Sequence, residues 1–355
     1  MVGHVYSSLK PLAFPDRLQA IAGGKIPAPV HVRIKPTNVC NHSCYFCAYR
    51  NDGLSLGNDM MVRDRIPREK MQEICADLIA MDVKAVTFSG GGEPLIYPYI
   101  AETITTLAKG DIHIGMLSNG SRLRGKAADA MAEHGTWLRV SIDGWDGASY
   151  ARYRSVEETE FAKVIDNLHQ FSKRQSRCTL GASVIIDKDN AAHLFELCSI
   201  LKNAGVVHAK LSPCILKNDG AENNRYHVAF ASLVEEQIDL CNALNDEHFR
   251  IINHYHRLDE MFHLPYQTCH MAKLLTVIGA DSVVYTCQDK AYTESGKLGS
   301  IKDKRFKEFW FSDENQSSLC AVNPSKDCTH HCVAASKLAV IDDFINLHHE
   351  HIAFV

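Results

Sequence analysis

The chain has 355 residues, of which 46% are hydrophobic and 23% are charged, and its formal net charge is −4. This length allows a large buried core, and the lack of a dominant basic surface argues against nucleic acid as the main partner. No apolar run approaches the roughly 18–20 residues that cross a bilayer, and the first residues lack the charged leader and apolar core of a secretion signal. We therefore expect a cytoplasmic protein that does not contact a membrane.

In chain order, residues 1–30 are expected to form an irregular or partly helical lead-in, because prolines and the pair Gly23-Gly24 interrupt any long helix. From residue 31 to residue 217, short apolar strands alternate with helical patterns. Strands are expected at 30–35, 84–88, 113–117, 137–142, 179–186 and 209–212, and helices at 63–81, 97–107, 124–134, 158–173 and 191–204. This alternation implies an α/β fold with parallel strand pairing and helices on the outside.

The remaining chain divides into a connector and a smaller C-terminal part. Residues 218–262 carry helical patterns, notably 228–244, and are expected to form a helical connector. In residues 263–355, two apolar segments around Ala280-Asp281-Ser282 predict a β-hairpin, and a helix is expected at 306–311.

Cysteines carry the clearest chemical signal. The chain has thirteen, which in a protein without a secretion signal points to metal or redox chemistry and not to disulfides. The segment Cys40-Asn41-His42-Ser43-Cys44-Tyr45-Phe46-Cys47 places three thiols at C-x3-C-x2-C spacing. A structural zinc site normally takes four protein ligands, whereas three close thiolates suit a cubane iron–sulfur cluster with one open iron. A reduced thiol cluster or structural zinc is the alternative.

This cysteine loop, the run Val32–Asn41 that leads into it, and the later Ser89-Gly90-Gly91-Gly92-Glu93-Pro94 together resemble the radical S-adenosylmethionine (SAM) superfamily. The resemblance implies a partial (β/α)6 barrel over residues 31–217 and a [4Fe-4S] cluster held by Cys40, Cys44 and Cys47, with SAM on the fourth iron. It also implies a one-electron donor such as a flavodoxin or ferredoxin, and reductive cleavage of SAM to a 5′-deoxyadenosyl radical that removes a substrate hydrogen. In parallel barrels, chemistry lies at the carboxyl ends of the strands, where these motifs fall.

The resemblance also assigns residues that contact SAM. Phe46 is expected against the adenine, Glu93 on the methionine ammonium, and an arginine fork on the methionine carboxylate. Core packing is the alternative for Phe46, and turn capping is the alternative for each single polar residue. The expected SAM-binding set is Phe46, Gly91, Gly92, Glu93, Ser118, Asn119, Ser141 and Arg154, with Arg152 as the second choice of arginine.

The C-terminal cysteines resemble the SPASM/twitch extension of some radical SAM enzymes. The resemblance implies one auxiliary [4Fe-4S] cluster on Cys269, Cys287, Cys328 and Cys332, in a small α+β extension. Two features depart from the pattern: Ser282 replaces a glycine usual in the hairpin turn, and the last pair is C-x3-C where C-x2-C is common. Cys320 is left over and could replace one ligand, and a structural zinc on the same four thiols is the alternative.

Cys214 follows the sixth expected strand and is a candidate hydrogen donor to a substrate radical, although a lone cysteine is more often a buried apolar group. Lys210 and Asp143 are candidate substrate contacts. The expected function is oxidation or epimerisation of a carbon in a small polar molecule, such as a sugar, aminocyclitol or nucleoside-like compound. The short lead-in favours this over modification of a ribosomal peptide, which stays open. A non-catalytic iron–sulfur or zinc protein is the third alternative.

Overall fold

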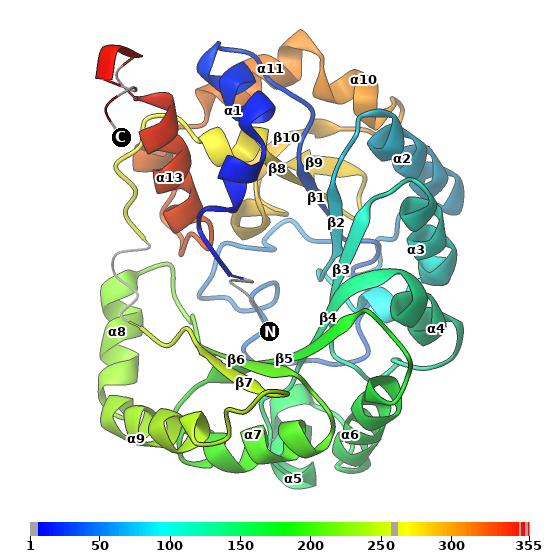
Figure 1. Ribbon diagram of the computed structural model, residues 1–355, viewed down its shortest axis with the longest axis vertical. Coiled ribbons are helices and arrows are strands. Elements are labelled where there is room, and N and C mark those ends of the chain that lie inside the picture. Colours follow the sequence, from blue (N-terminus) through cyan, green and yellow to red (C-terminus); the bar gives the residue numbers. More distant parts are fainter. Residues whose placement is uncertain (1–5, 257–261, 348, 352–353, 355) are drawn as a thin grey trace.

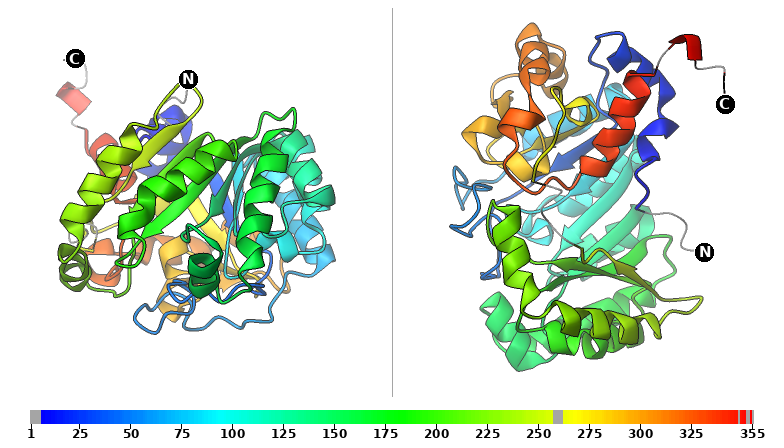
Figure 2. Two further views of the ribbon diagram at one scale, coloured as in Figure 1. Left: turned by 90° about the horizontal axis from the view of Figure 1, so that it is seen from below. Right: turned by 90° about the vertical axis from the view of Figure 1, so that its left-hand side faces the viewer.

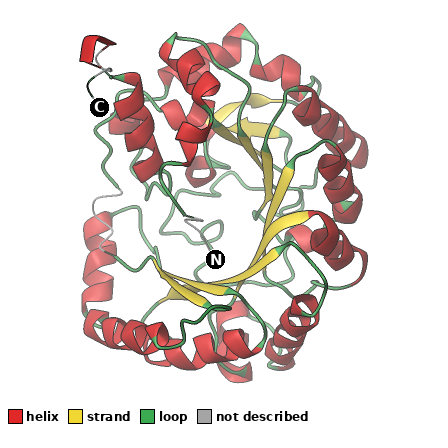
Figure 3. Ribbon diagram, viewed as in Figure 1, coloured by secondary structure: helices red, strands yellow, loops and turns green. Residues whose placement is uncertain are grey.

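The computed structural model describes residues 6–256, 262–347, 349–351 and 354. Its centre is one curved ten-stranded sheet whose outer face is covered by helices (Figure 1; Figure 3). The strands are β1 (His31–Ile34), β2 (Ala85–Phe88), β3 (His113–Ser118), β4 (Gly135–Ser141), β5 (Thr179–Ile186), β6 (His208–Pro213), β7 (Arg250–Asn253), β8 (Leu275–Ile278), β9 (Val283–Tyr285) and β10 (Lys297–Ser300).

Helices follow most of the strands in sequence. They are α1 (Pro15–Ala22), α2 (Arg68–Ala80), α3 (Ile100–Lys109), α4 (Gly125–His134), α5 (Gly147–Arg154), α6 (Thr159–Ser172), α7 (Leu194–Asn203), α8 (Gly220–Val228), α9 (Ala231–Asn242), α10 (Phe306–Trp310), α11 (Asp313–Ala321), α12 (Pro324–Asp327) and α13 (Ala335–Ile345). Within the described residues, none of the helices is both long and apolar enough to cross a membrane.

The strand order is β10-β9-β8-β1-β2-β3-β4-β5-β6-β7. The strands from β8 to β7 in this order pair in parallel, and β9 and β10 complete the sheet in antiparallel fashion. The run β1 to β6, with its outer helices, confirms the predicted α/β partial barrel. The C-terminal segment continues the same sheet, because β8 pairs with β1.

Each barrel strand is half apolar because its side chains alternate between two faces. Val32 and Ile34 of β1 and Leu138 and Val140 of β4 are fully buried in the main core between sheet and helices. Their strand neighbours face the interior of the barrel. A second small core joins α1 to α13 through Leu18 and Ile341, among others.

Two local features differ from the sequence-based expectations. β7 lies inside the segment expected to be a helical connector and pairs with β6. α2 begins at Arg68, five residues after the expected start, because Pro67 occupies its N-cap with an extended backbone. The hairpin of β8 and β9 forms as expected. Ser282 in its turn adopts φ +60°, the conformation that glycine adopts most easily.

Candidate functional site

The loop between β1 and α2, which carries the first three cysteines, lies across one end of the barrel (Figure 2). The Gly92 amide donates to the carbonyl oxygen of Thr37 at 3.0 Å. A Cβ atom added to Gly91 would lie 2.0 Å from Asn38 Oδ1, and one added to Gly92 would lie 2.0 Å from the carbonyl oxygen of Val39. The two glycines are therefore required for the segment after β2 to pack against the approach to the cysteine loop.

Cys40, Cys44 and Cys47 are all partly exposed. Burial raises the pKa of Cys40 to about 11 and raises the pKa of Cys47, and the negative charge of Cys44 adds to both shifts. Arg154 Nη1 donates to Cys44 Sγ at 3.4 Å. Thiols lose their protons when they bind a metal, so three neighbouring thiols beside a guanidinium fit the ligand set of an iron–sulfur cluster.

Buried polar groups without partners frame this loop. His42 is 4% exposed, and neither of its ring nitrogens has a hydrogen-bond partner in the described part of the chain. Burial and the charge of Arg154 lower the pKa of His42 to about 4, so the ring is neutral at pH 7. Arg50 Nε is also buried and unpartnered. Such groups are rare in finished cores and are expected around a site that takes a further group.

Glu93 is buried where β2 and β3 end, and protein donors already satisfy its carboxylate. Ser118 Oγ donates to Oε1 at 2.7 Å, the Asn119 amide donates to Oε2 at 2.7 Å, and the Leu95 amide donates to Oε1 at 3.0 Å. Burial raises the pKa of Glu93, whereas these bonds oppose the rise. Asn119 Nδ2 also donates to Asn41 Oδ1 at 3.0 Å, which ties the cysteine loop to the end of β3.

Arg154 ends α5 and lies at the same site, but its guanidinium is engaged. It forms a buried ion pair with Asp143, whose other oxygen accepts from the Ile185 amide at 2.7 Å. Arg154 Nε is buried without a partner. The hydroxyl of Ser141 has no hydrogen-bond partner among the described residues, and its side chain is partly exposed. The structure therefore brings Arg154 to the cysteine loop and pairs it with a carboxylate of the protein itself.

Phe46 packs among charged and aromatic neighbours in the cysteine loop. Its ring lies edge-on to Tyr45 at 5.2 Å and to Tyr153 at 5.9 Å between centroids, and the Arg154 guanidinium lies 5.4 Å from its centroid. The ring remains partly exposed. Cys214 directly follows β6 and is 1% exposed, and His227 Nε2 donates to its carbonyl oxygen at 2.9 Å. Burial, with the charges of Asp187 and Asp143, strongly raises the pKa of the Cys214 thiol.

The later cysteines lie on separate segments, close enough for their charges to act on one another. Cys269 precedes a short 3-10 helix, Cys287 follows β9, and Cys328 and Cys332 follow α12. The charges of Cys269 and Cys332 add to the burial that raises the pKa of Cys287, and those of Cys269 and Cys328 do the same for Cys332. Cys320 in α11 is exposed.

Two further side chains at this second thiol group were not expected from the sequence. Ligand atoms of Cys287, Asp289 and His330 all lie within 4.8 Å of one another. Asp289 is two residues after Cys287, and His330 lies between Cys328 and Cys332. The sequence does contain a signal for these two residues, because each lies within two residues of a cysteine that was expected to be a cluster ligand.

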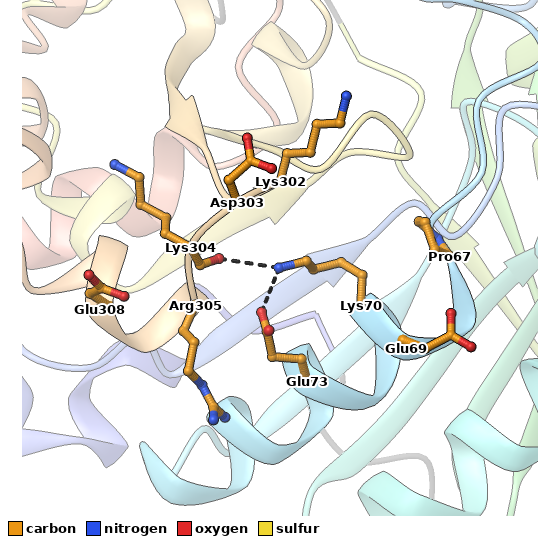
Figure 4. A pocket seen from close by; sticks show the side chains of 9 residues that line it. All are labelled: Pro67, Glu69, Lys70, Glu73, Lys302, Asp303, Lys304, Arg305 and Glu308. Carbon is orange, nitrogen blue, oxygen red and sulfur yellow. Dashed lines mark hydrogen bonds and ion pairs between the residues drawn. The ribbon is translucent and has the colours of Figure 1, made fainter.

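One surface hollow has none of these thiols in its lining. It has a volume of about 490 Å³ and is lined by α2 and the segment before α10. Lys70 in it donates to Glu73 at 2.6 Å and to the Lys304 carbonyl oxygen at 3.3 Å (Figure 4). Its charges are of both signs and are partly paired, and nothing in it resembles a reaction centre.

Comparison with known proteins decides the family of the barrel. Residues 34–201 match the model of the radical SAM superfamily. These residues are a radical SAM domain. Domains of this kind use a [4Fe-4S] cluster and SAM, and the three thiols of the loop fit the ligand set of the cluster.

Curated relatives match part of this chain. A SAM-dependent nucleotide dehydratase of Lacinutrix mariniflava is 24% identical over 139 residues, which is 37% of this chain and 29% of the relative. A GTP 3′,8-cyclase of Aeromonas hydrophila is 26% identical over 140 residues, which is 39% of this chain and 40% of the relative. The match thus spans well under half of either relative.

Solved structures extend the likeness in fold beyond the radical SAM domain. Streptococcus suis SuiB bound to SAM superposes with a TM-score of 0.61 at 14% identity, over 90% of this chain and 75% of that chain. SuiB bound to its precursor peptide SuiA superposes with a TM-score of 0.57 at 14% identity, over 93% and 82%. The shared fold therefore extends well beyond residues 34–201, which the family model matches.

Proposed function

We propose that this chain is a radical SAM enzyme that oxidises or epimerises a carbon of a small polar molecule. The observation that supports radical chemistry is the placement of three thiols beside the ends of β2 and β3, with Arg154 on Cys44. When bound, the cluster and SAM supply a carbon radical that takes up a substrate hydrogen, and an auxiliary cluster supplies an acceptor for an electron.

The residues of the chain have separable roles in this proposal. Cys40, Cys44 and Cys47 hold the cluster, while Phe46, Gly91, Gly92, Glu93, Ser118, Asn119, Ser141 and Arg154 form the surroundings of SAM. The Ser141 hydroxyl is available for a ligand, whereas Glu93 acts first as the buried acceptor that fixes Ser118 and Asn119. Each carboxylate oxygen can accept more than one hydrogen bond, so Glu93 can also accept a bond from an ammonium group.

The inner face of the barrel supports a small polar substrate. The positions that face inward in β2, β4, β5 and β6 include Thr87, Ser141, Ser183 and Ser212, each next to a buried apolar residue of the same strand. The relatives named for a nucleotide or GTP add support for a small molecule. SuiB, which binds a precursor peptide, keeps peptide modification as the alternative.

The decisive experiment identifies the source of the abstracted hydrogen. An extract of cells grown in heavy water is first separated by molecular mass into a small-molecule fraction and a peptide fraction. Reconstituted enzyme is then incubated with SAM, a one-electron reductant and each fraction in turn. We expect deuterium in 5′-deoxyadenosine only with the small-molecule fraction, because the radical takes its hydrogen from substrate. Label transferred only from the peptide fraction would replace this proposal by the alternative.

The same assay run in heavy water with unlabelled substrate tests Cys214. If its thiol returns a hydrogen atom to the substrate, the product gains deuterium from solvent, and Cys214→Ser forms 5′-deoxyadenosine without that product. Oxidation predicts no uptake of solvent deuterium into the product and normal turnover by Cys214→Ser. Wild-type turnover in the variant would remove Cys214 from the mechanism.

We also propose an auxiliary [4Fe-4S] cluster on Cys269, Cys287, Cys328 and Cys332. Anaerobically reconstituted protein should then bind about eight iron atoms, and the double variant Cys287→Ala/Cys332→Ala about four. Cys320→Ala, at an exposed thiol, is the control and should retain about eight. About four iron atoms together with zinc in the wild-type protein would show a zinc site in place of the second cluster.

A further inference from the structure

Cations gather on the inner face of the barrel. Arg33 lies in β1, Arg139 in β4 and Lys210 in β6, and Lys35 directly follows β1. The strand neighbours of the first three are fully buried in the main core: Val32, Ile34, Leu138, Val140, Ala209 and Leu211. Because side chains alternate along a strand, the three cations point into the barrel, where each is partly exposed.

Arg139 and Lys210 meet at one aromatic ring. Arg139 Nη1 donates to the Tyr6 hydroxyl at 2.9 Å, and Lys210 Nζ lies 5.5 Å from the centroid of the Tyr6 ring. Arg33 is close enough to interact electrostatically with both. Burial, followed by repulsion from Arg139 and Arg33, lowers the pKa of Lys210 to about 8.

Among the residues that the structure describes, these cations have no carboxylate partner within ion-pair distance. Within the described residues, no ion pair includes Arg33, Lys35, Arg139 or Lys210. The charge of Asp289 acts on Arg33 and Lys35, but no ion pair joins it to either cation in the described part of the chain. Arg33 Nε and Arg139 Nε are buried with no hydrogen-bond partner.

Lys35 differs from the other three cations because it is structurally engaged. It is fully buried and donates to the Tyr49 hydroxyl and to the Gly90 carbonyl oxygen. Lys35 thus anchors the glycine segment after β2. Arg33, Arg139 and Lys210 remain as a group of like charges, and no carboxylate of the described residues forms an ion pair with them.

Like charges that are partly removed from water destabilise a fold unless an opposite charge joins them. Guanidinium groups bind phosphate through paired hydrogen bonds, and an ammonium adds a point charge. Three cations exceed the charge of one carboxylate and suffice to neutralise a phosphate dianion. We propose that the substrate carries a phosphate group, which Arg33, Arg139 and Lys210 bind inside the barrel. This inference rests on the proposed function, because the phosphate group is assigned to the substrate of that reaction.

The test measures anion binding without turnover. Pyrophosphate and inorganic phosphate are titrated into the full chain by calorimetry at constant ionic strength, with citrate and chloride as other anions. We expect the wild-type protein to bind pyrophosphate and phosphate. The affinity should fall by about tenfold or more in Arg139→Gln and in Lys210→Gln, since each variant loses a charge-assisted contact. Two separate variants are used so that failure of one to fold leaves the other.

A matched control removes a cation from the outer hollow. Lys302→Gln, in the lining shown in Figure 4, should bind pyrophosphate as the wild-type protein does. Equal weakening by Lys302→Gln, or unchanged affinity in both barrel variants, would overturn the proposal. Tighter binding of citrate than of pyrophosphate would overturn it in favour of a carboxylate substrate.

The result is separable from the proposed function. SAM cleavage by the wild-type protein with a chemical reductant is measured in parallel. Pyrophosphate binding at the barrel cations without any SAM cleavage would reject radical chemistry and retain the anion site. SAM cleavage without anion binding would reject the phosphate substrate and retain the radical enzyme.

Discussion

Replacing Cys40, Cys44 and Cys47 together by alanine is expected to abolish formation of 5′-deoxyadenosine from SAM. The variant should also bind about four fewer iron atoms than the wild-type protein, because a cubane needs thiolate ligands and none would remain in the loop. The thiols are partly exposed and the loop is anchored through other residues, such as Asn41 on Asn119. The barrel should therefore still fold.

The control is Cys320→Ala, which removes an exposed thiol outside both proposed ligand sets. Its iron content and SAM cleavage should equal those of the wild-type protein. Circular dichroism and thermal unfolding establish that the triple variant is folded. Persistent SAM cleavage by a folded triple variant would contradict the assignment of these three cysteines.

The sequence predicts the barrel well because strand alternation and helical periodicity are local properties. β5 is observed at the expected residues, Thr179–Ile186. β7 was missed because it has only four residues, Arg250–Asn253, and its side chains are exposed or partly exposed. α5 was also missed, although the capping box of Asp146 and Ser149 marks its start.

The site was predictable in its residue types but not in its partners. Sequence and resemblance select Glu93 and Arg154, yet the donors to Glu93 come from the end of β3, and the acceptor for Arg154 comes from the end of β4. Such pairings depend on the order of strands in the sheet. The interior cations Arg33 and Arg139 were not singled out, since an isolated arginine in an apolar strand gives no sign of what it faces.

The buried ion pair of Asp143 and Arg154 leads to the second large effect. Asp143→Asn is expected to lower the free energy of unfolding by about 3–5 kcal/mol. Asparagine keeps an oxygen that can accept from the Ile185 amide, so the change mainly removes the charge. Arg154 is 4% exposed and cannot release its proton, which leaves an uncompensated buried charge beside Cys44.

Replacing Arg154, the other partner of this ion pair, should lower the free energy of unfolding less at low pH than at high pH. Burial already raises the pKa of Asp143, and the charge of Arg154 opposes that rise. In Arg154→Met the pKa of Asp143 therefore rises further, and the carboxyl can become neutral by taking up a proton. An acid whose pKa is higher in the folded state stabilises the fold below its unfolded pKa, about 3.9, and loses that contribution as pH rises through the folded pKa.

The two variants consequently differ in how stability depends on pH. Denaturant unfolding between about pH 4 and pH 8 should show Arg154→Met losing stability with increasing pH relative to the wild-type protein, because the protonated Asp143 becomes harder to maintain. Asp143→Asn lacks the titrating carboxyl, and its guanidinium stays charged throughout, so this site should add no pH dependence to the stability of that variant. Matching pH profiles for the two variants, or a loss below about 1 kcal/mol in Asp143→Asn, would show that the pair behaves like an exposed ion pair and that water reaches Arg154.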